Sequence, residues 1–296
     1  MSPSHNAAER ARHLKGILLM LLGVSLISVL DTTGKYLTKS YPVYQVVWAR
    51  YAFHVLFMLL LLAPRLGLDL VRTRRPALQF TRGLVLTLAT FVFFKSLSLM
   101  PQAEASAIAF LSPVLVAVLA VPLLGERANT STWIALSLGF LGTLLIIRPG
   151  SGVFTWNALW PLATAFCFAG YQIITRKLAG IDSSVSTLFL SALIGAVILS
   201  FVAPFHWTPL KDLNDGLLFA SLGISGSISH YFLIRAFSLA PAPVVAPFVY
   251  AQLVMALVLG YLVFGDFPDG MSLAGMGIIV VAGTWLISRN HRSPAK

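Results

Sequence analysis

The chain has 296 residues, of which 57% are hydrophobic and only 10% charged, and its mean hydropathy is +0.85. An ordinary soluble domain carries roughly a quarter charged residues, so this chain has too few charges to cover a water-facing surface. The composition therefore excludes a soluble globular enzyme. It predicts an all-α polytopic membrane protein.

The net charge of +11 comes from 21 basic and 10 acidic side chains. The basic residues lie between long apolar runs and not in one patch, which favours contacts with anionic lipid over nucleic-acid binding. The single cysteine, Cys167, has no partner within one chain, which excludes a disulfide framework and a cysteine metal site. We expect no cofactor and no metal.

A helix needs about 20 apolar residues to cross the hydrocarbon core of a bilayer. Ten segments meet that requirement: 16–36, 43–63, 78–99, 101–124, 130–148, 155–178, 184–204, 215–238, 241–264 and 270–288. Prolines, glycines and charged residues separate them. The first segment resembles a signal peptide, but its apolar part is too long and lacks a clear cleavage site, which favours a retained helix.

Ten spans place both termini on one side of the membrane, and the distribution of basic residues indicates which side. Fifteen lysines and arginines fall on the terminal side and five on the other, while Arg50 lies inside a span. Because cytoplasmic loops are enriched in basic residues, both termini are predicted to be cytoplasmic in the inner (plasma) membrane.

The two halves of the chain resemble each other at an offset of 140 to 141 residues. Three matches carry this repeat: Gly142–Arg148 with Gly283–Arg289, five of seven residues being identical, Lys95–Pro101 with Arg235–Pro241, and Gly125-Glu126 with Gly265-Asp266. We predict a first repeat at 1–150 and a second at 151–296. Chance similarity between apolar segments is the alternative.

A repeat of five spans has an odd number of crossings, so the second copy enters the membrane from the opposite side. The sequence thus predicts ten transmembrane helices arranged as two inverted five-helix repeats. Many secondary transporters have inverted repeats, with the substrate site near the membrane midplane and alternating access by movement of the halves.

Several short motifs in the two halves are typical of a known transporter family. They are Pro113 in the fourth span, Gly125-Glu126-Arg127, Trp133, Gly139-Phe140-Leu141-Gly142, the run from Pro247 to Gln252, and Phe264-Gly265-Asp266. The chain resembles the drug/metabolite transporter superfamily, specifically the ten-helix EamA-type carriers that include exporters of amino acids and other metabolites. Two positions depart from that pattern, since Asp266 replaces the usual Glu and Leu253 stands opposite Pro113. The resemblance implies small-metabolite transport, usually efflux.

Charged residues within spans are costly in a membrane and are candidates for function. On a rise of 1.5 Å per residue, Asp31 lies about 22 Å and Arg50 about 20 Å from the cytoplasmic face, so the two can pair. The pair is either a structural bridge or part of a cavity that binds a carboxylate or an ammonium group. His54 follows Arg50 by four residues and shares its helical face.

A small, polar stripe occurs on the third span and again on the eighth. Gly83, Thr87 and Thr90 correspond in the repeat to Gly223, Ser227 and His230. The stripes either pack helices closely, with hydroxyls bonded to their own carbonyls, or line the substrate pathway. An imidazole in hydrocarbon needs a partner or water, so His230 favours the pathway.

Other residues are assigned to the mouths, the hinges and the deep part of the pathway. Lys95 and Arg235 occupy equivalent positions in the two repeats, at opposite mouths of the pathway. They either guard these mouths or extend to the lipid headgroups. Glu104 is the expected partner of Lys95. Pro113, Pro243 and Pro247 remove backbone donors and are expected hinges. The deep aromatic and amide candidates are Trp160, Tyr171, Gln172, Tyr231, Tyr250 and Gln252.

These residues predict a secondary transporter that moves small amphipathic metabolites by alternating access, exporting amino acids with aromatic or other apolar side chains. A carrier for a flavin, a nucleoside or S-adenosylmethionine is the alternative. A channel or scaffold is less favoured because of the repeat, and a membrane enzyme because no HExxH, CxxC, G-x-S-x-G or P-loop pattern occurs. The expected partners are a small-molecule substrate, the bilayer and, as a further candidate, protons; no oligomer is implied.

Overall fold

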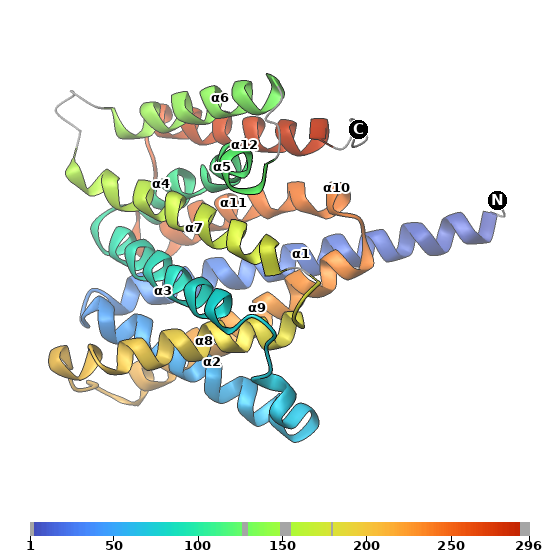
Figure 1. Ribbon diagram of the computed structural model, residues 1–296. Coiled ribbons are helices and arrows are strands. Elements are labelled where there is room, and N and C mark those ends of the chain that lie inside the picture. Colours follow the sequence, from blue (N-terminus) through green and yellow to red (C-terminus); the bar gives the residue numbers. More distant parts are fainter. Residues whose placement is uncertain (1–2, 126–129, 149–154, 179, 291–296) are drawn as a thin grey trace.

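The computed structural model describes residues 3–125, 130–148, 155–178 and 180–290. Throughout these ranges the chain forms helices joined by short loops, and no strand occurs in them (Figure 1). Seven helices are long and apolar enough to cross a membrane, and three shorter apolar helices lie at Trp133–Ile147, Ser184–Ser200 and Gly270–Trp285. The all-helical prediction is confirmed, and ten transmembrane spans stay a prediction.

The helices of the first half follow the predicted segments closely. They are α1 (Pro3–Leu37), α2 (Val43–Leu66), the 3-10 helix η1 (Gly67–Leu70), α3 (Pro76–Leu99), α4 (Gln102–Ala109), α5 (Ser112–Leu124) and α6 (Thr130–Ile147). Pro76 occupies the first turn of α3, where its missing N–H costs nothing. Gly125 ends α5 at a φ of 70°, which glycine adopts without steric strain.

The second half has a similar series of helices. It contains η2 (Trp156–Ala158), α7 (Leu159–Leu178), α8 (Ser184–Ser200), η3 (Ala203–His206), α9 (Leu213–Leu239), α10 (Ala242–Val245), η4 (Ala246–Tyr250), α11 (Ala251–Phe264) and α12 (Gly270–Asn290). Side-chain oxygens of Ser183 and Asp212 cap the starts of α8 and α9 by accepting from the N–H groups of Ser186 and Asp215. Gly265 ends α11 at a φ of 73°.

The fourth and ninth predicted spans are not continuous helices. The fourth breaks between Ala109 and Ser112, and the ninth contains the 3-10 turn at Ala246–Tyr250. Pro113 and Pro247 lie just after the start of the following segments, where each lacks the N–H that would continue the preceding helix. The two breaks meet, because the rings of Phe110 and Tyr250 lie 5.3 Å apart.

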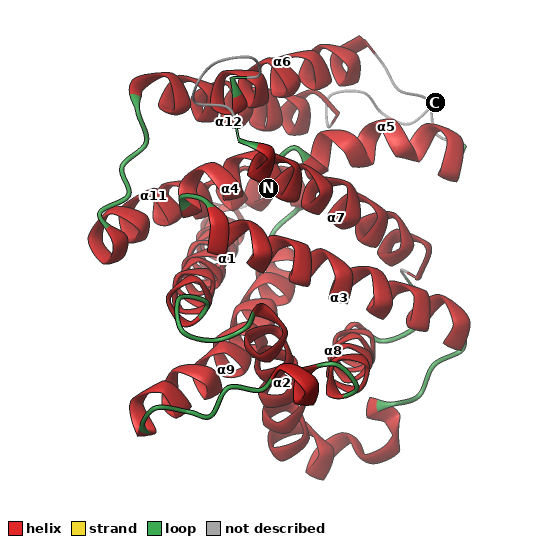
Figure 2. Cartoon of the chain, turned by 90° about the vertical axis from the view of Figure 1, so that its left-hand side faces the viewer, coloured by secondary structure: helices red, strands yellow, loops and turns green. Residues whose placement is uncertain are grey.

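Helices of the first half pack mainly against helices of the second. The pair of α1 and α9 has a counterpart in α7 and α3, and the pair of α2 and α9 has one in α8 and α3. In addition, α2 packs along α8 and α6 along α12. Figure 2 shows α6 and α12 together at one edge of the bundle, with α2, α8 and α9 at the opposite edge.

Glycines allow the closest of these helix contacts. A Cβ atom at Gly223 of α9 would lie 2.3 Å from the backbone nitrogen of His54 in α2. A Cβ at Gly83 of α3 would lie 2.7 Å from the side chain of Ile194 in α8. The glycine of each polar stripe therefore lies at a close helix contact, as small residues commonly do within membranes.

Gly223→Ala is expected to lower the stability of the purified protein by about 1 to 3 kcal/mol, because the added methyl group meets backbone and cannot be accommodated by a rotamer change. Thermal unfolding in detergent measures the effect. Gly277→Ala in α12 is the matched control, since nothing lies within 4 Å of a Cβ built there. Equal unfolding temperatures for the two variants would contradict the close contact.

Candidate functional site

A cavity of about 220 Å³ lies within the bundle, where α1, α2, α3, α7 and α9 meet the two interrupted spans. Its polar lining consists of Asp31, Arg50, Thr90, Ser106, Ser112, Tyr171, Ser229, His230 and Gln252. Its apolar lining consists of Ile27, Leu30, Leu86, Phe93, Ala109, Phe110 and Phe168. An apolar pocket with a few convergent polar groups is the usual form of a small-molecule site.

The two charged residues of the cavity come from adjacent helices. Asp31 of α1 is only 4% exposed and accepts a hydrogen bond of 3.3 Å from Nε2 of Gln252. Arg50 of α2 donates from Nη1 to Oγ1 of Thr90 at 3.0 Å. The cavity therefore carries one carboxylate and one guanidinium, each held by a neutral partner.

The direct ion pair expected between Asp31 and Arg50 is not formed. Among the described residues, no ion pair within 4.0 Å joins them, although both line the same cavity. The guanidinium instead lies toward α3, near Thr90, with the rings of Tyr51 and Phe94 at 5.5 and 5.8 Å from its central carbon. Both charges thus stay available to a ligand.

Thr90, Tyr171, His230 and Gln252 also line the cavity, as their assignment to the pathway requires. Three polar cavity residues were not anticipated, namely Ser106, Ser112 and Ser229. Of these, Ser106 has its Oγ buried without a hydrogen-bond partner in the described part of the chain. A buried hydroxyl without a partner is costly unless a ligand or water satisfies it. No sequence signal distinguished Ser106 from other serines in helices.

The remaining pathway candidates lie outside the cavity. Thr87 and Ser227 are buried and donate to the carbonyls of Gly83 and Gly223, four residues earlier, as the packing interpretation expects. His54 lies behind the wall, with its ring 6.4 Å from that of His230. The cavity lining also does not include Trp160, Gln172, Tyr231 and Tyr250.

Helix geometry explains why two of these aromatic residues miss the cavity. Tyr231 follows His230 directly, so it points about 100° away around α9 and is 57% exposed. Tyr250 is buried at the end of η4, where it contacts Phe110 and lines a separate groove between α11 and α12. Depth in the membrane alone did not indicate which way either residue faces.

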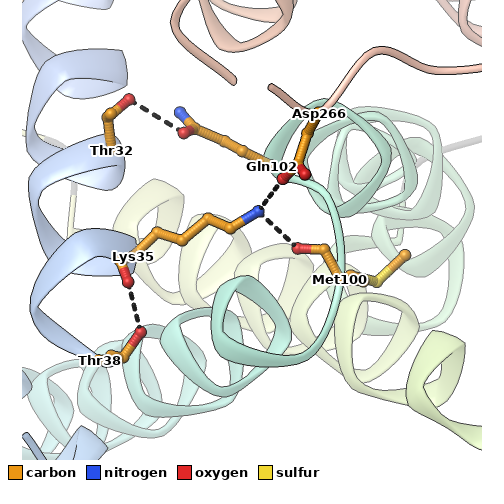
Figure 3. A network of polar contacts seen from close by, with 6 residues as sticks. All are labelled: Thr32, Lys35, Thr38, Met100, Gln102 and Asp266. Atoms are coloured by element: carbon orange, nitrogen blue, oxygen red, sulfur yellow. Dashed lines mark hydrogen bonds and ion pairs between the residues drawn. The ribbon is translucent and has the colours of Figure 1, made fainter. Parts of the chain in front are cut away.

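A series of hydrogen bonds runs along one face of α1, on both sides of Asp31. Oγ of Ser28 donates to the carbonyl of Gln252 at 3.1 Å, and Oγ1 of Thr32 donates to Oε1 of Gln102 at 2.9 Å. Lys35, one turn further on, donates to the carbonyl of Met100 at 3.1 Å and forms a 2.6 Å ion pair with Asp266 (Figure 3). We call Ser28, Thr32 and Lys35 the α1 polar face; it joins α1 to α4 and to both ends of α11.

The expected partnership of Lys95 with Glu104 does not occur. Glu104 faces α12 and accepts a hydrogen bond of 3.2 Å from Oγ of Ser272, while Lys35 occupies the Met100 carbonyl just before α4. In the described ranges neither Lys95 nor Arg235 has an acidic partner within 4.0 Å. Of the predicted hinge residues, Pro247 lies at the interruption of the ninth span and Pro243 lies in α10.

Arg82, one of the fifteen basic residues counted on the terminal side of the membrane, is buried within the bundle. It is 4% exposed and donates to Oγ1 of Thr175 at 2.7 Å, to the carbonyl of Thr187 at 3.0 Å, and to the hydroxyls of Ser191 and Tyr171. Since Tyr171 lines the cavity, Arg82 lies directly behind its wall. Arg82 lies on the face of α3 opposite its exposed leucines, and this helical pattern would have predicted that it points inward.

Comparisons with known proteins agree with this architecture. The model of the EamA-like transporter family matches residues 14–148 and again 155–289. One solved crystal structure has a similar fold, with a TM-score of 0.63 at 19% identity, covering 96% of this chain and 99% of the other.

Three similar proteins have names that state a transported molecule. The S-adenosylmethionine uptake transporter of Rickettsia prowazekii is 31% identical, with 95% of both chains covered. The riboflavin transporter of Rhizobium johnstonii is 30% identical, with 100% of this chain and 99% of the relative covered. The pseudopaline exporter CntI of Pseudomonas aeruginosa is 27% identical, with 94% and 97% covered. The chain belongs to the EamA-like transporter family of the drug/metabolite transporter superfamily.

Proposed function

We propose that this transporter carries a small zwitterionic metabolite, a free amino acid with an apolar or aromatic side chain or a larger molecule that bears an amino-acid group. The observation that carries the proposal is the placement of Asp31 and Arg50 on one cavity without a direct ion pair. A substrate ammonium group fits Asp31, and a substrate carboxylate fits Arg50.

The rest of the lining supports the same class of substrate. Phe93, Phe110 and Phe168 offer apolar and aromatic surface for a side chain or a base. The hydroxyl of Ser106 offers a hydrogen bond that no described residue uses. S-Adenosylmethionine, named for one relative, has both an amino-acid group and an aromatic base, whereas riboflavin, named for another, lacks the amino-acid group.

Counterflow into proteoliposomes tests the substrate class. Vesicles preloaded with unlabelled compound are given labelled phenylalanine, S-adenosylmethionine or riboflavin, and saturable exchange is measured. We expect exchange of at least one of the two compounds that carry an amino-acid group. Exchange of riboflavin alone would contradict the proposal and favour the flavin as substrate. Because the named relatives include an uptake transporter and an exporter, the same vesicles should be used to establish direction.

We also propose that residues 1–150 and 151–296 are inverted repeats that give alternating access. The two family matches begin and end 141 residues apart, which supports this division. The helix pairs support it as well, because exchanging the halves converts the contact of α1 with α9 into that of α7 with α3. Pairs such as α6 with α12 are unchanged by the exchange, as expected on a pseudo-two-fold axis.

In this mechanism the α1 polar face closes the mouth at the C-terminal end of α1. Its hydrogen bonds join the first half to Gln252 and Asp266 of the second half. Gln252 also donates to Asp31 in the cavity, so a substrate ammonium group that takes this position competes with one of the closing contacts. Substrate binding and opening of the mouth are thereby coupled.

The termini are proposed to be cytoplasmic. Figure 1 shows α1 beginning and α12 ending at the same side of the bundle, as an even number of crossings requires. In a Cys167→Ser background, we expect an impermeant thiol reagent to label Lys211→Cys but not Arg74→Cys in intact cells. The reverse labelling would reverse the orientation.

A further inference from the structure

A second concave site lies at the end of the bundle where α3 begins and α7 ends, far in sequence from the cavity residues of α1 and α11. It is an open groove of about 600 Å³ with three basic side chains, Arg74, Arg75 and Lys177. Pro76, Ala77 and Ile181 add apolar surface. The transport mechanism proposed above uses none of these residues.

Asp182, in the turn between α7 and α8, holds the two sides of the groove together. Its carboxylate accepts hydrogen bonds from the backbone N–H of Arg74 at 2.9 Å, from the hydroxyl of Thr73, and from Nε2 of Gln79 at 2.9 Å. The loop that carries Arg74 and Arg75 is thereby fixed beside the end of α7, which carries Lys177. The groove is therefore fixed by hydrogen bonds and is not formed by long side chains alone.

The charge of the groove is offset only in part, by the single carboxylate of Asp182 near Arg74. In the part of the chain that the structure describes, none of its three basic side chains has a carboxylate within 4.0 Å. Desolvation raises the pKa of Asp182, but the hydrogen bonds from Arg74, Thr73 and Gln79 outweigh it and lower that pKa, so the carboxylate stays ionised in its role of holding the loop. The groove therefore has a net positive charge and attracts an anion.

The surface that continues from the groove is apolar and exposed. Phe80, Leu84 and Leu88 of α3 are 54%, 43% and 51% exposed, and they lie on the same helical face as Ala77 of the groove. In a helix that crosses a bilayer, such a stripe faces acyl chains. A positive pocket at one end of a lipid-facing stripe matches the two parts of an anionic phospholipid.

We propose that this groove binds the phosphate headgroup of an anionic phospholipid whose acyl chains lie along Phe80, Leu84 and Leu88. The basic side chains and the first backbone N–H groups of α3 face the phosphate. Free phosphate shares the headgroup chemistry, but it leaves the apolar stripe without a role. The lipid contacts α3 on the side opposite Arg82 and Thr90, so it supports the helix that forms one wall of the cavity.

Binding to the purified full-length protein in detergent tests the site. Short-chain phosphatidylglycerol is titrated, bound lipid is counted by native mass spectrometry, and phosphatidylcholine of equal chain length serves as the neutral probe. Each basic residue near an anionic headgroup strengthens association by about fivefold. We therefore expect Arg74→Gln/Arg75→Gln/Lys177→Gln to weaken phosphatidylglycerol binding at least tenfold and to leave phosphatidylcholine binding unchanged.

The control variant removes three basic residues at the same end of the bundle but outside the groove, Arg12→Gln/Lys15→Gln/Arg65→Gln. We expect it to bind phosphatidylglycerol like the unchanged protein, and equal weakening in both triple variants would overturn the site. Displacement of phosphatidylglycerol by low-millimolar inorganic phosphate would also overturn it, by showing a site for soluble anions. If the groove variant fails to fold, Lys177→Glu alone is expected to weaken binding at least fivefold, and unchanged binding would refute the proposal.

Discussion

Asp31→Asn and Arg50→Gln are each expected to reduce transport at least tenfold at equal expression. Both substitutions keep the approximate shape of the side chain but remove the charge that faces the cavity. A hydrogen bond to a charged group contributes about 1.5 to 3 kcal/mol, which corresponds to roughly a tenfold to hundredfold loss of affinity. Initial rates of counterflow over a range of substrate concentrations measure the loss.

Arg72→Gln provides the control for the loss of a charge. Arg72 is exposed, and its one ion pair among the described residues is with Asp69, three residues away, at 3.7 Å. We expect this variant to transport normally. Normal transport by Asp31→Asn and Arg50→Gln would remove the cavity from the substrate pathway, whatever the behaviour of Arg72→Gln.

Lys35→Gln is expected to open the mouth that the α1 polar face closes. Lys35 is 8% exposed, and its substitution removes both the ion pair with Asp266 and the bond to the Met100 carbonyl. Because Asp266 is 31% exposed, breaking this pair costs more than the roughly 1 kcal/mol of an exposed pair and less than the about 3 to 5 kcal/mol of a fully buried one, which still shifts a two-state equilibrium. A cysteine introduced at Ser106 should then react several times faster with an impermeant reagent added from that side.

Lys39→Gln is the matched control. Like Lys35, Lys39 lies over the ring of Phe264, at 4.6 Å compared with 4.7 Å, but it has no ion pair in the described structure. We expect unchanged reactivity in Lys39→Gln and partial recovery of the closed state in Lys35→Asp/Asp266→Lys. Faster reaction in both single variants would mean that the Asp266 pair does not close the mouth.

The sequence was sufficient to predict the helical segments and the charged residues of the cavity. Hydropathy locates apolar segments well because the bilayer requires about 20 apolar residues per crossing. Depth along the helices brought Asp31 and Arg50 to one level, and both line the cavity. Their partners were not predictable, since whether Arg50 contacts Asp31 or Thr90 depends on how α2 is rotated against α3.

The remaining differences have similar physical causes. Arg82 was counted only among the basic residues on the terminal side, because it lies near the start of a span, but it points inward to Tyr171 and Thr175. Tyr231 was placed in the pathway because it lies deep, but it points outward. Depth follows from counting residues, whereas the direction of a side chain depends on the contacts between helices that are far apart in the sequence.

Recognition of both ends of a zwitterion is the central claim, and competition by substrate analogues in counterflow tests it most directly. Once a transported compound with an amino-acid group is identified, its exchange is measured in the presence of one analogue without the ammonium group and one without the carboxylate. We predict that each analogue competes at least tenfold more weakly than the intact compound, because Asp31 or Arg50 is then left without its partner. Equal competition by both analogues would show that neither charge binds substrate and would contradict the account.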